Sequence, residues 1–225
     1  MEIKDLEGKI LYDLGENVKT LESINFKKLN LKGADFRNAH LYNADFRKAN
    51  LERADFSGAD LRRAGFIKAN LTEAIFDKAI IEGGAFQKAV LREASFKETN
   101  LWRASFLKAN LYRTTFTKSN LRHASFEKAN LLRADLAGAN LHETYFGGAI
   151  LCMTKGVFSF NFTQQSGYAW KEGKETIVKI GHLEYPLSEW LANSFIPNGF
   201  TKDFEYTDND IDFYKSMLKF IQEHF

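Results

Sequence analysis

A large apolar residue recurs at every fifth position between residues 21 and 151, and this period restricts the fold more than any other feature of the chain. Phe and Leu alternate along the tract, as in Phe26, Leu31, Phe36 and Leu41, and a small residue lies two positions before nearly every one. A spacing of five fits neither the period of 3.6 of an α-helix nor the period of 2 of a flat strand. We therefore expect a chain that turns a corner every five residues, so that four corners close a coil of about twenty.

Such coils stack at the spacing of neighbouring strands, about 4.8 Å, and turn every fifth side chain toward a common axis. The alternation then gives two opposite walls of Leu and two opposite walls of Phe. One Leu wall comprises Leu31, Leu51, Leu71, Leu91 and Leu111, and one Phe wall comprises Phe26, Phe46, Phe66, Phe86 and Phe106. The residue before each central Leu or Phe is often Asn or Asp, and we expect these short polar side chains to bond neighbouring backbone at the turns.

The stretch ADFRNAHLYNADFRKANLERADFSGADLRRA resembles the pentapeptide-repeat family, whose pattern is A-(D/N)-(L/F)-x-x. The resemblance implies an all-β fold, a right-handed quadrilateral parallel β-helix, for residues 21–151. It also implies a function class, because some members of the family protect DNA gyrase from quinolones by imitating duplex DNA with a negatively charged rod. Those members dimerise through C-terminal elements.

The flanks break the period and are expected to close the ends of the coil, whose open edges expose unpaired backbone groups. Residues 1–20 form the N-terminal cap, with a short strand at Lys9–Tyr12. Residues 152–225 form a small α+β cap or dimerisation element, with strands at Val157–Thr163 and Thr176–Ile180 and a short helix that starts near Pro186. A terminal helix carries an apolar stripe, which is the candidate dimer contact: Ile211, Tyr214, Leu218, Ile221 and Phe225.

The repeat tract is basic and its flanks are acidic. The whole chain has a formal net charge of +2, but residues 26–150 contain 21 Lys and Arg against 13 Asp and Glu. Imitation of duplex DNA needs the opposite sign, because a duplex carries one negative charge per roughly 1.7 Å of its axis. A topoisomerase partner therefore remains an alternative that requires one contiguously acidic face.

A lysine follows two residues after each Phe of one wall, once per coil. These lysines are Lys28, Lys48, Lys68, Lys88, Lys108 and Lys128. Ammonium groups about 5 Å apart repel each other unless they splay or meet anions. The column is either a solvated edge or a binding surface, and binding of nucleic acid along it is a further alternative. Tyr42, Trp102 and Tyr112 point outward and complete the candidate binding surface, because exposed aromatic residues can anchor a partner.

Other positions in the tract have simpler interpretations. Arginines on the Leu walls, such as Arg62, Arg63, Arg103 and Arg113, are expected to pair with glutamates of neighbouring coils. Ile75, Ile80, Ala85 and Val90 replace the polar residues around one complete coil, and this apolar belt is either a contact surface or tolerated drift.

No constellation of residues indicates catalysis. The five histidines are dispersed, no nucleophile has a base at a suitable spacing, and no Gly-rich phosphate loop occurs. We expect no cofactor and no metal, and an enzyme would need an unexpected pocket around Trp170, His182 and Trp190. The single cysteine, Cys152, cannot form an internal disulfide. No apolar run is long enough to span a membrane and no signal-peptide pattern begins the chain, which predicts a cytoplasmic protein. The sequence thus predicts a non-enzymatic scaffold or macromolecule-binding rod with a protein partner.

Overall fold

The computed structural model describes residues 2–15, 20–161, 166–172, 174–180, 183–192, 215–219 and 221–223. The chain divides into two compact units, Met1–Gly156 and Val157–Phe225. The first unit ends one repeat later than the expected boundary at residue 151, because Lys155 still pairs with Asp135 of the preceding coil. Each unit is described by itself.

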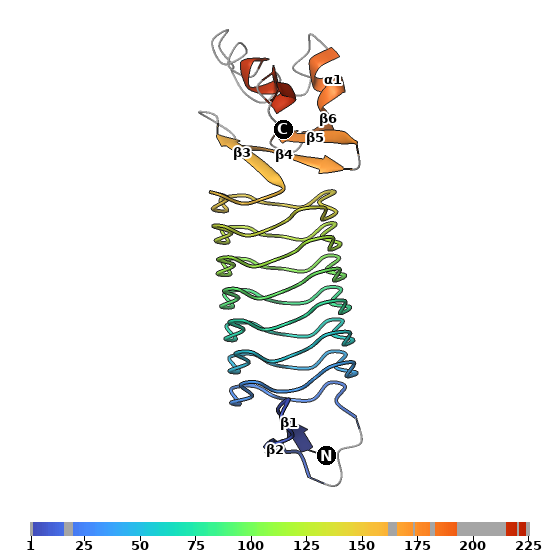
Figure 1. Ribbon diagram of the computed structural model, residues 1–225, viewed down its shortest axis with the longest axis vertical. Coiled ribbons are helices and arrows are strands. Elements are labelled where there is room, and N and C mark those ends of the chain that lie inside the picture. Colours follow the sequence, from blue (N-terminus) through green and yellow to red (C-terminus); the bar gives the residue numbers. More distant parts are fainter. Residues whose placement is uncertain are drawn as a thin grey trace. The chain divides into compact units, whose positions relative to one another are not determined.

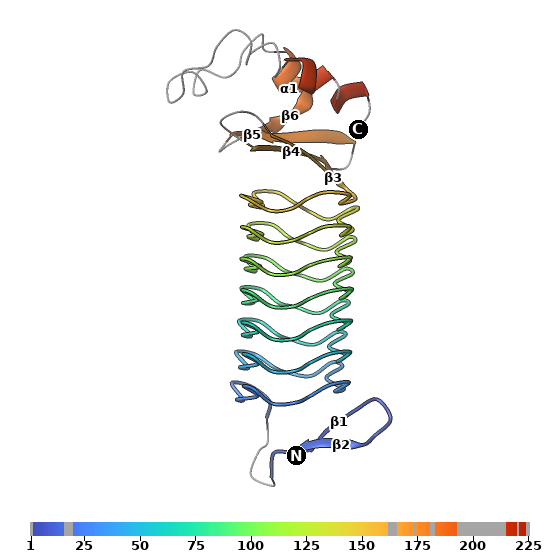
Figure 2. The same ribbon diagram turned by 90° about the vertical axis from the view of Figure 1, so that its left-hand side faces the viewer.

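Strands β1 (Glu2–Lys4) and β2 (Ile10–Asp13) form an antiparallel hairpin at the start of the first unit. The strand predicted at Lys9–Tyr12 corresponds to β2, whereas β1 was not predicted. The hairpin joins the first coil, because Asp5 bridges Ala34 and the N–H of Asp35 donates to the carbonyl of Lys4 at 2.8 Å. Ile3 is buried, and Figure 2 shows the hairpin next to the first coil.

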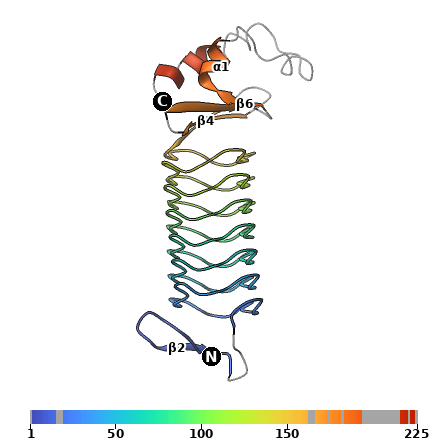
Figure 3. The same ribbon diagram turned by 90° about the vertical axis from the view of Figure 1, so that its right-hand side faces the viewer.

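The repeats form a β-helix whose coils contain twenty residues and four sides. Parallel bridges join each residue before a central Phe or Leu to the residue twenty positions later, from Asn25 with Asp45 to Asp135 with Lys155. Figure 1 shows the coils stacked in one column, and Figures 2 and 3 show that their corners stay aligned from coil to coil. The expected four-sided coil is confirmed.

The repeat Ala54–Gly58 shows why five residues suffice for one side, because every backbone N–H in it has an acceptor. Asp55 donates to Ala34 in the coil before it, and Phe56 and Gly58 donate to the coil after it. Ala54 donates to the carbonyl of Leu51 at 3.1 Å and closes the turn. The remaining N–H, of Ser57, donates to the Asp55 carboxylate at 2.8 Å. The predicted role of the Asn and Asp residues is therefore confirmed, because they accept the one N–H that the coils leave free.

The interior consists of the predicted Leu and Phe walls. Rings twenty residues apart are stacked, as in Phe56 and Phe76 with centroids 4.8 Å apart. Rings ten residues apart come from opposite walls and meet edge to face, as in Phe66 and Phe76 at 5.7 Å. Because the two Phe walls interlock across the axis and the Leu side chains between them are fully buried, the column has a continuous apolar core.

The second unit contains an antiparallel sheet in the order β3-β4-β5-β6. Its strands are β3 (Val157–Asn161), β4 (Ser166–Glu172), β5 (Glu175–Ile180) and β6 (Leu183–Pro186), and α1 (Leu187–Ala192) follows. Residues 215–219 and 221–223 are helical. The predicted strands correspond to β3 and β5 and the predicted short helix to α1, but β6 was not predicted because its four residues lack a clear alternation.

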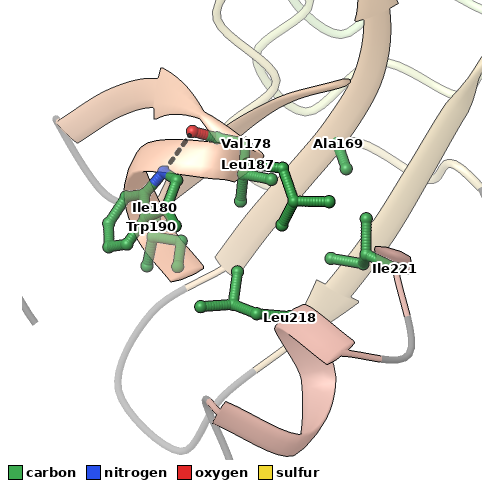
Figure 4. Close-up of a cluster of buried hydrophobic side chains, with 7 residues drawn as sticks. All are labelled: Ala169, Val178, Ile180, Leu187, Trp190, Leu218 and Ile221. Atoms are coloured by element: carbon green, nitrogen blue, oxygen red, sulfur yellow. Dashed lines mark hydrogen bonds between the residues drawn. The ribbon is translucent and has the colours of Figure 1, made fainter. Parts of the chain in front are cut away.

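A small apolar core holds this unit together (Figure 4). Trp190 of α1 lies against the sheet, and its indole N–H donates to the carbonyl of Val178 at 3.0 Å. Leu218 and Ile221 of the helical segments are buried in the same cluster, at 6% and 1% exposure. These two residues of the predicted apolar stripe are thus covered within the second unit.

Candidate binding surfaces

Each lysine of the predicted column occupies the third residue of a turn, where the backbone has a positive φ. The values run from 55° at Lys128 to 64° at Lys28. The backbone N–H still joins the next coil, since that of Lys48 donates to the carbonyl of Ile67 at 3.0 Å. The turn therefore holds the Cα of every lysine at one corner, and all six side chains are exposed.

We call the outward side chains of the repeats centred on Phe26, Phe46, Phe66, Phe86, Phe106 and Phe126 the lysine face. It carries eight Lys and Arg against two acidic residues, Asp45 and Glu127, and so holds six of the eight net positive charges of residues 26–150. The opposite face, centred on Phe36, Phe56, Phe76, Phe96, Phe116 and Leu136, has four cations and five acids. The charge of the array is therefore concentrated on one side.

The two acids of the lysine face are already engaged. Asp45 accepts from the Arg47 guanidinium at 2.6 Å, and this hydrogen bond lowers the pKa of the Asp45 carboxyl below its usual value. Glu127 lies 3.2 Å from the ammonium of Lys128. Within the described residues, the other five lysines of the column have no acidic partner, so their mutual repulsion is uncompensated.

Several cations of the other faces have acidic partners. On the face centred on Leu31, Lys32 pairs with Glu52 at 2.8 Å and Arg53 with Glu73 at 2.8 Å. Of the arginine pairs predicted from the sequence, Arg113 does pair with Glu93, at 3.5 Å. Arg62 instead binds Asp60 of its own side, and this hydrogen bond lowers the pKa of the Asp60 carboxyl.

The three predicted aromatic anchors do not lie on the lysine face. Tyr42 and Trp102 occupy one column of the face centred on Leu41, three coils apart. Tyr112 lies on the opposite Leu face, between Arg92 and Arg113, whose guanidinium carbons are 5.4 and 5.2 Å from its ring centroid. The structure thus distributes the predicted surface over three faces.

The remaining predicted sites are only partly described. Ile211, Tyr214 and Phe225 of the dimer contact lie outside the described residues, as does His182, while Leu218 and Ile221 are buried in the second unit. Trp170 and Trp190 are buried as well. Dimerisation through the terminal helix stays a prediction.

Two general findings apply to the described part of the chain. It contains no group of three His, Cys, Asp or Glu side chains arranged to hold a metal ion. None of its helices combines the length and the apolar character that crossing a membrane requires.

Comparison with known proteins identifies the repeats. A family model described as pentapeptide repeat region matches residues 59–136, and one described as pentapeptide repeats (8 copies) matches residues 21–58, so the two cover more than half of the chain. A search of curated proteins found no match.

Solved structures with similar folds include two characterised repeat proteins. A trypsin-treated variant of QnrB1, a plasmid-mediated fluoroquinolone resistance protein, is 22% identical, with 60% of this chain and 71% of that chain covered and a TM-score of 0.48. HetL, a pentapeptide repeat protein involved in heterocyst differentiation regulation from Nostoc sp. strain PCC 7120, is 27% identical, with 59% and 74% covered and a TM-score of 0.34.

Proposed function

The chain belongs to the pentapeptide-repeat family, and from this premise we propose that it is a non-enzymatic binding rod whose lysine face engages an acidic surface of a partner protein. Proteins of this family are generally non-enzymatic structural or binding proteins. The single observation that carries the proposal is the column of six lysines, five of which have no acidic partner within the described residues. An acidic partner would relieve the repulsion between neighbouring lysines, whose backbone positions lie about 5 Å apart in successive coils.

The side chains beside the lysines favour a protein over a nucleic acid. Ile67 and Leu107 lie on the lysine face, each directly before a lysine, and both are partly buried. Apolar side chains in this position add contact area for the apolar groups of a protein partner. Phosphate groups gain nothing from them, because a nucleic acid backbone is bound mainly through its charge.

Imitation of DNA is less favoured by the charge distribution. The most acidic face has a net charge of only −1, and one of its acids, Asp35, is bound by Arg37 at 2.7 Å. A purified gyrase assay separates the two functions. Protection of gyrase from a quinolone by the native chain would favour the topoisomerase alternative over the lysine face.

Removing four charges from the lysine face is expected to weaken binding of an acidic polypeptide. The variant combines Lys48→Gln, Lys68→Gln, Lys88→Gln and Lys108→Gln, and the probe is fluorescently labelled poly-L-glutamate at low salt. Since exposed ion pairs contribute about 0.2–1 kcal/mol each, four of them predict a loss in affinity of about fourfold or more. Fluorescence anisotropy measures it, and the native affinity should fall as salt is added.

The control removes the same charge from another face. It combines Arg53→Gln, Arg92→Gln, Arg113→Gln and Arg133→Gln on the face centred on Leu31, where two of these residues pair with glutamates. If net charge alone governs binding, both variants lose affinity equally, and the lysine face has no special role. Tighter binding of a duplex oligonucleotide than of poly-L-glutamate would instead support the nucleic-acid alternative.

A further inference from the structure

A hollow of about 400 Å³ opens on the arginine face, which comprises the outward side chains of the repeats centred on Leu41, Leu61, Ile81 and Leu101. Its lining includes Tyr42, Arg63, Glu82, Gly83, Trp102 and Arg103. We call it the Gly83 hollow. It lies on a different face from the lysine column.

The hollow exists because one turn in the column lacks a side chain. The third residue of successive turns on this face is Asn43, Arg63, Gly83 and Arg103. Gly83 has a φ of +66°, and a Cβ added to it would meet no atom within 4 Å. A long side chain in the coils before and after, and none at Gly83, leaves a gap about two coils wide, or about 10 Å.

Two guanidinium groups border this gap without an acidic partner. Arg63 and Arg103 form no ion pair within the described residues, whereas the neighbouring Arg62 is held by Asp60. Arg103 lies over the ring of Trp102, with its guanidinium carbon 4.2 Å from the centroid. Stacking against an indole orients a guanidinium and leaves its N–H edge available to a carboxylate.

The one acid in the lining, Glu82, is held by a neighbouring coil and keeps its charge. Glu82 accepts from the side-chain amide of Asn100 at 2.8 Å and makes no ion pair with the bordering arginines within the described residues. The hollow therefore presents two arginines without an acidic partner, an indole and a phenol, and Arg62, whose guanidinium carbon is 5.8 Å from the Tyr42 ring centroid, also lines it. Trp, Tyr and Arg are the residues most enriched where protein interfaces concentrate their binding energy.

We propose that the Gly83 hollow binds a carboxylate-bearing segment of a partner protein, in which Arg63 and Arg103 receive the carboxylates and Trp102 and Tyr42 contact the apolar atoms between them. Arginine is suited to this role because its planar fork donates two parallel hydrogen bonds to one carboxylate. The site goes beyond the lysine face, since it recognises a short segment rather than an extended acidic surface. The carboxylate comes from Asp or Glu side chains or from a chain terminus.

The test is an NMR titration of the ¹⁵N-labelled full chain with defined peptides. N-acetyl-Glu-Tyr-Glu-amide is expected to shift the indole N–H of Trp102 and the backbone amide of Gly83 in a saturable manner. N-acetyl-Gln-Tyr-Gln-amide, which has no charge, should bind at least fivefold more weakly. The same glutamine peptide with a free C-terminal carboxylate identifies the source of the carboxylate, since it binds like the first peptide only if a terminus suffices.

Two variants locate the site. Gly83→Gln fills the hollow without adding charge and is expected to abolish the shift of Trp102. The fold tolerates such a residue, because Glu73 and Glu93 occupy the same turn position with φ values of 58° and 59°. Gly33→Gln is the matched control, since Gly33 also has a positive φ and open space but lies on another face. Arg63→Gln should weaken binding at least fivefold.

Three results would overturn the assignment: no shift of Trp102, equal binding of the charged and uncharged amide peptides, or a shift that persists in Gly83→Gln. A single-stranded oligonucleotide that shifts Trp102 when the glutamate peptide does not would assign the hollow to nucleic acid instead. The four-lysine variant should keep the Trp102 shift, so failure of the lysine face and failure of the hollow remain distinguishable.

Discussion

Replacing Phe76 with alanine is expected to lower the free energy of unfolding of the repeat array by about 3–5 kcal/mol. The Phe76 ring is stacked between Phe56 and Phe96, with centroids 4.8 and 4.6 Å away, and it meets Phe66 and Phe86 edge to face. Truncation removes four ring contacts at once and leaves a cavity that the hydrogen-bonded coils cannot close. Guanidinium chloride unfolding followed by far-ultraviolet circular dichroism measures the loss.

Two further substitutions show whether the ladder is the cause. Phe76→Leu should cost about 1 kcal/mol, because it keeps most of the volume and because Leu136 already occupies the equivalent place in the same wall. Phe26→Ala should cost less than Phe76→Ala, since Phe26 begins its wall and has only one stacked neighbour, Phe46. Equal losses at Phe26 and Phe76 would show that the number of stacked neighbours does not set the cost, contrary to the nearest-neighbour expectation for a repeat array.

Gly84→Ala is expected to destabilise the array by about 1–3 kcal/mol, although alanine is the usual residue at this position of the repeat. A Cβ built on Gly84 would lie 2.6 Å from Cγ2 of Ile81. Ile81 stands where the other coils of this wall have Leu, and its second branch fills the space that the alanine methyl group occupies elsewhere. The two exceptions to the repeat therefore compensate for each other.

A double-mutant cycle tests this coupling. Ile81→Leu combined with Gly84→Ala should recover most of the stability that Gly84→Ala loses, with an interaction energy of about 0.5–3 kcal/mol. Gly65→Ala is the control, because its Cβ would lie 3.9 Å from the nearest atom, in the flexible Arg47 side chain. It removes the same chain entropy from the unfolded state and should be neutral or stabilising. Additive losses from Ile81→Leu and Gly84→Ala would contradict the compensation.

The architecture of the repeat unit could be derived from the sequence because it depends on a period. A five-residue spacing of Phe and Leu requires every fifth side chain to share one interior, and the alternation assigns each type to its own pair of walls. The role of the Asn and Asp residues could also be predicted, since a short polar side chain before a turn most often accepts a hydrogen bond from the backbone of that turn. The right-handed sense of the coil follows from membership of the family.

The candidate binding surfaces were harder to predict from the sequence, because they depend on which side chains of neighbouring coils contact each other. The twenty-residue spacing located the lysine column. The side-chain contacts between coils show that five of its six lysines have no acidic partner within the described residues, whereas Arg53 and Arg113 pair with glutamates. The sequence analysis placed Tyr42, Trp102 and Tyr112 on one candidate surface. In the structure, Tyr42 and Trp102 lie on one Leu face and Tyr112 lies on the opposite one. The signal for the Gly83 hollow was a single glycine in a column of longer residues, visible only when positions twenty apart are aligned.

The four-sided coil, its Leu and Phe walls and its excess of positive charge could be derived without coordinates, since each follows from a short repeat or from residue counts. The places where charge stays unpaired emerge only in the folded chain, because an ion pair depends on side-chain reach between neighbouring coils. The packing of Leu218 and Ile221 into the core of the second unit likewise emerges only there. An apolar stripe marks a helix face that must be covered, and the fold selects what covers it.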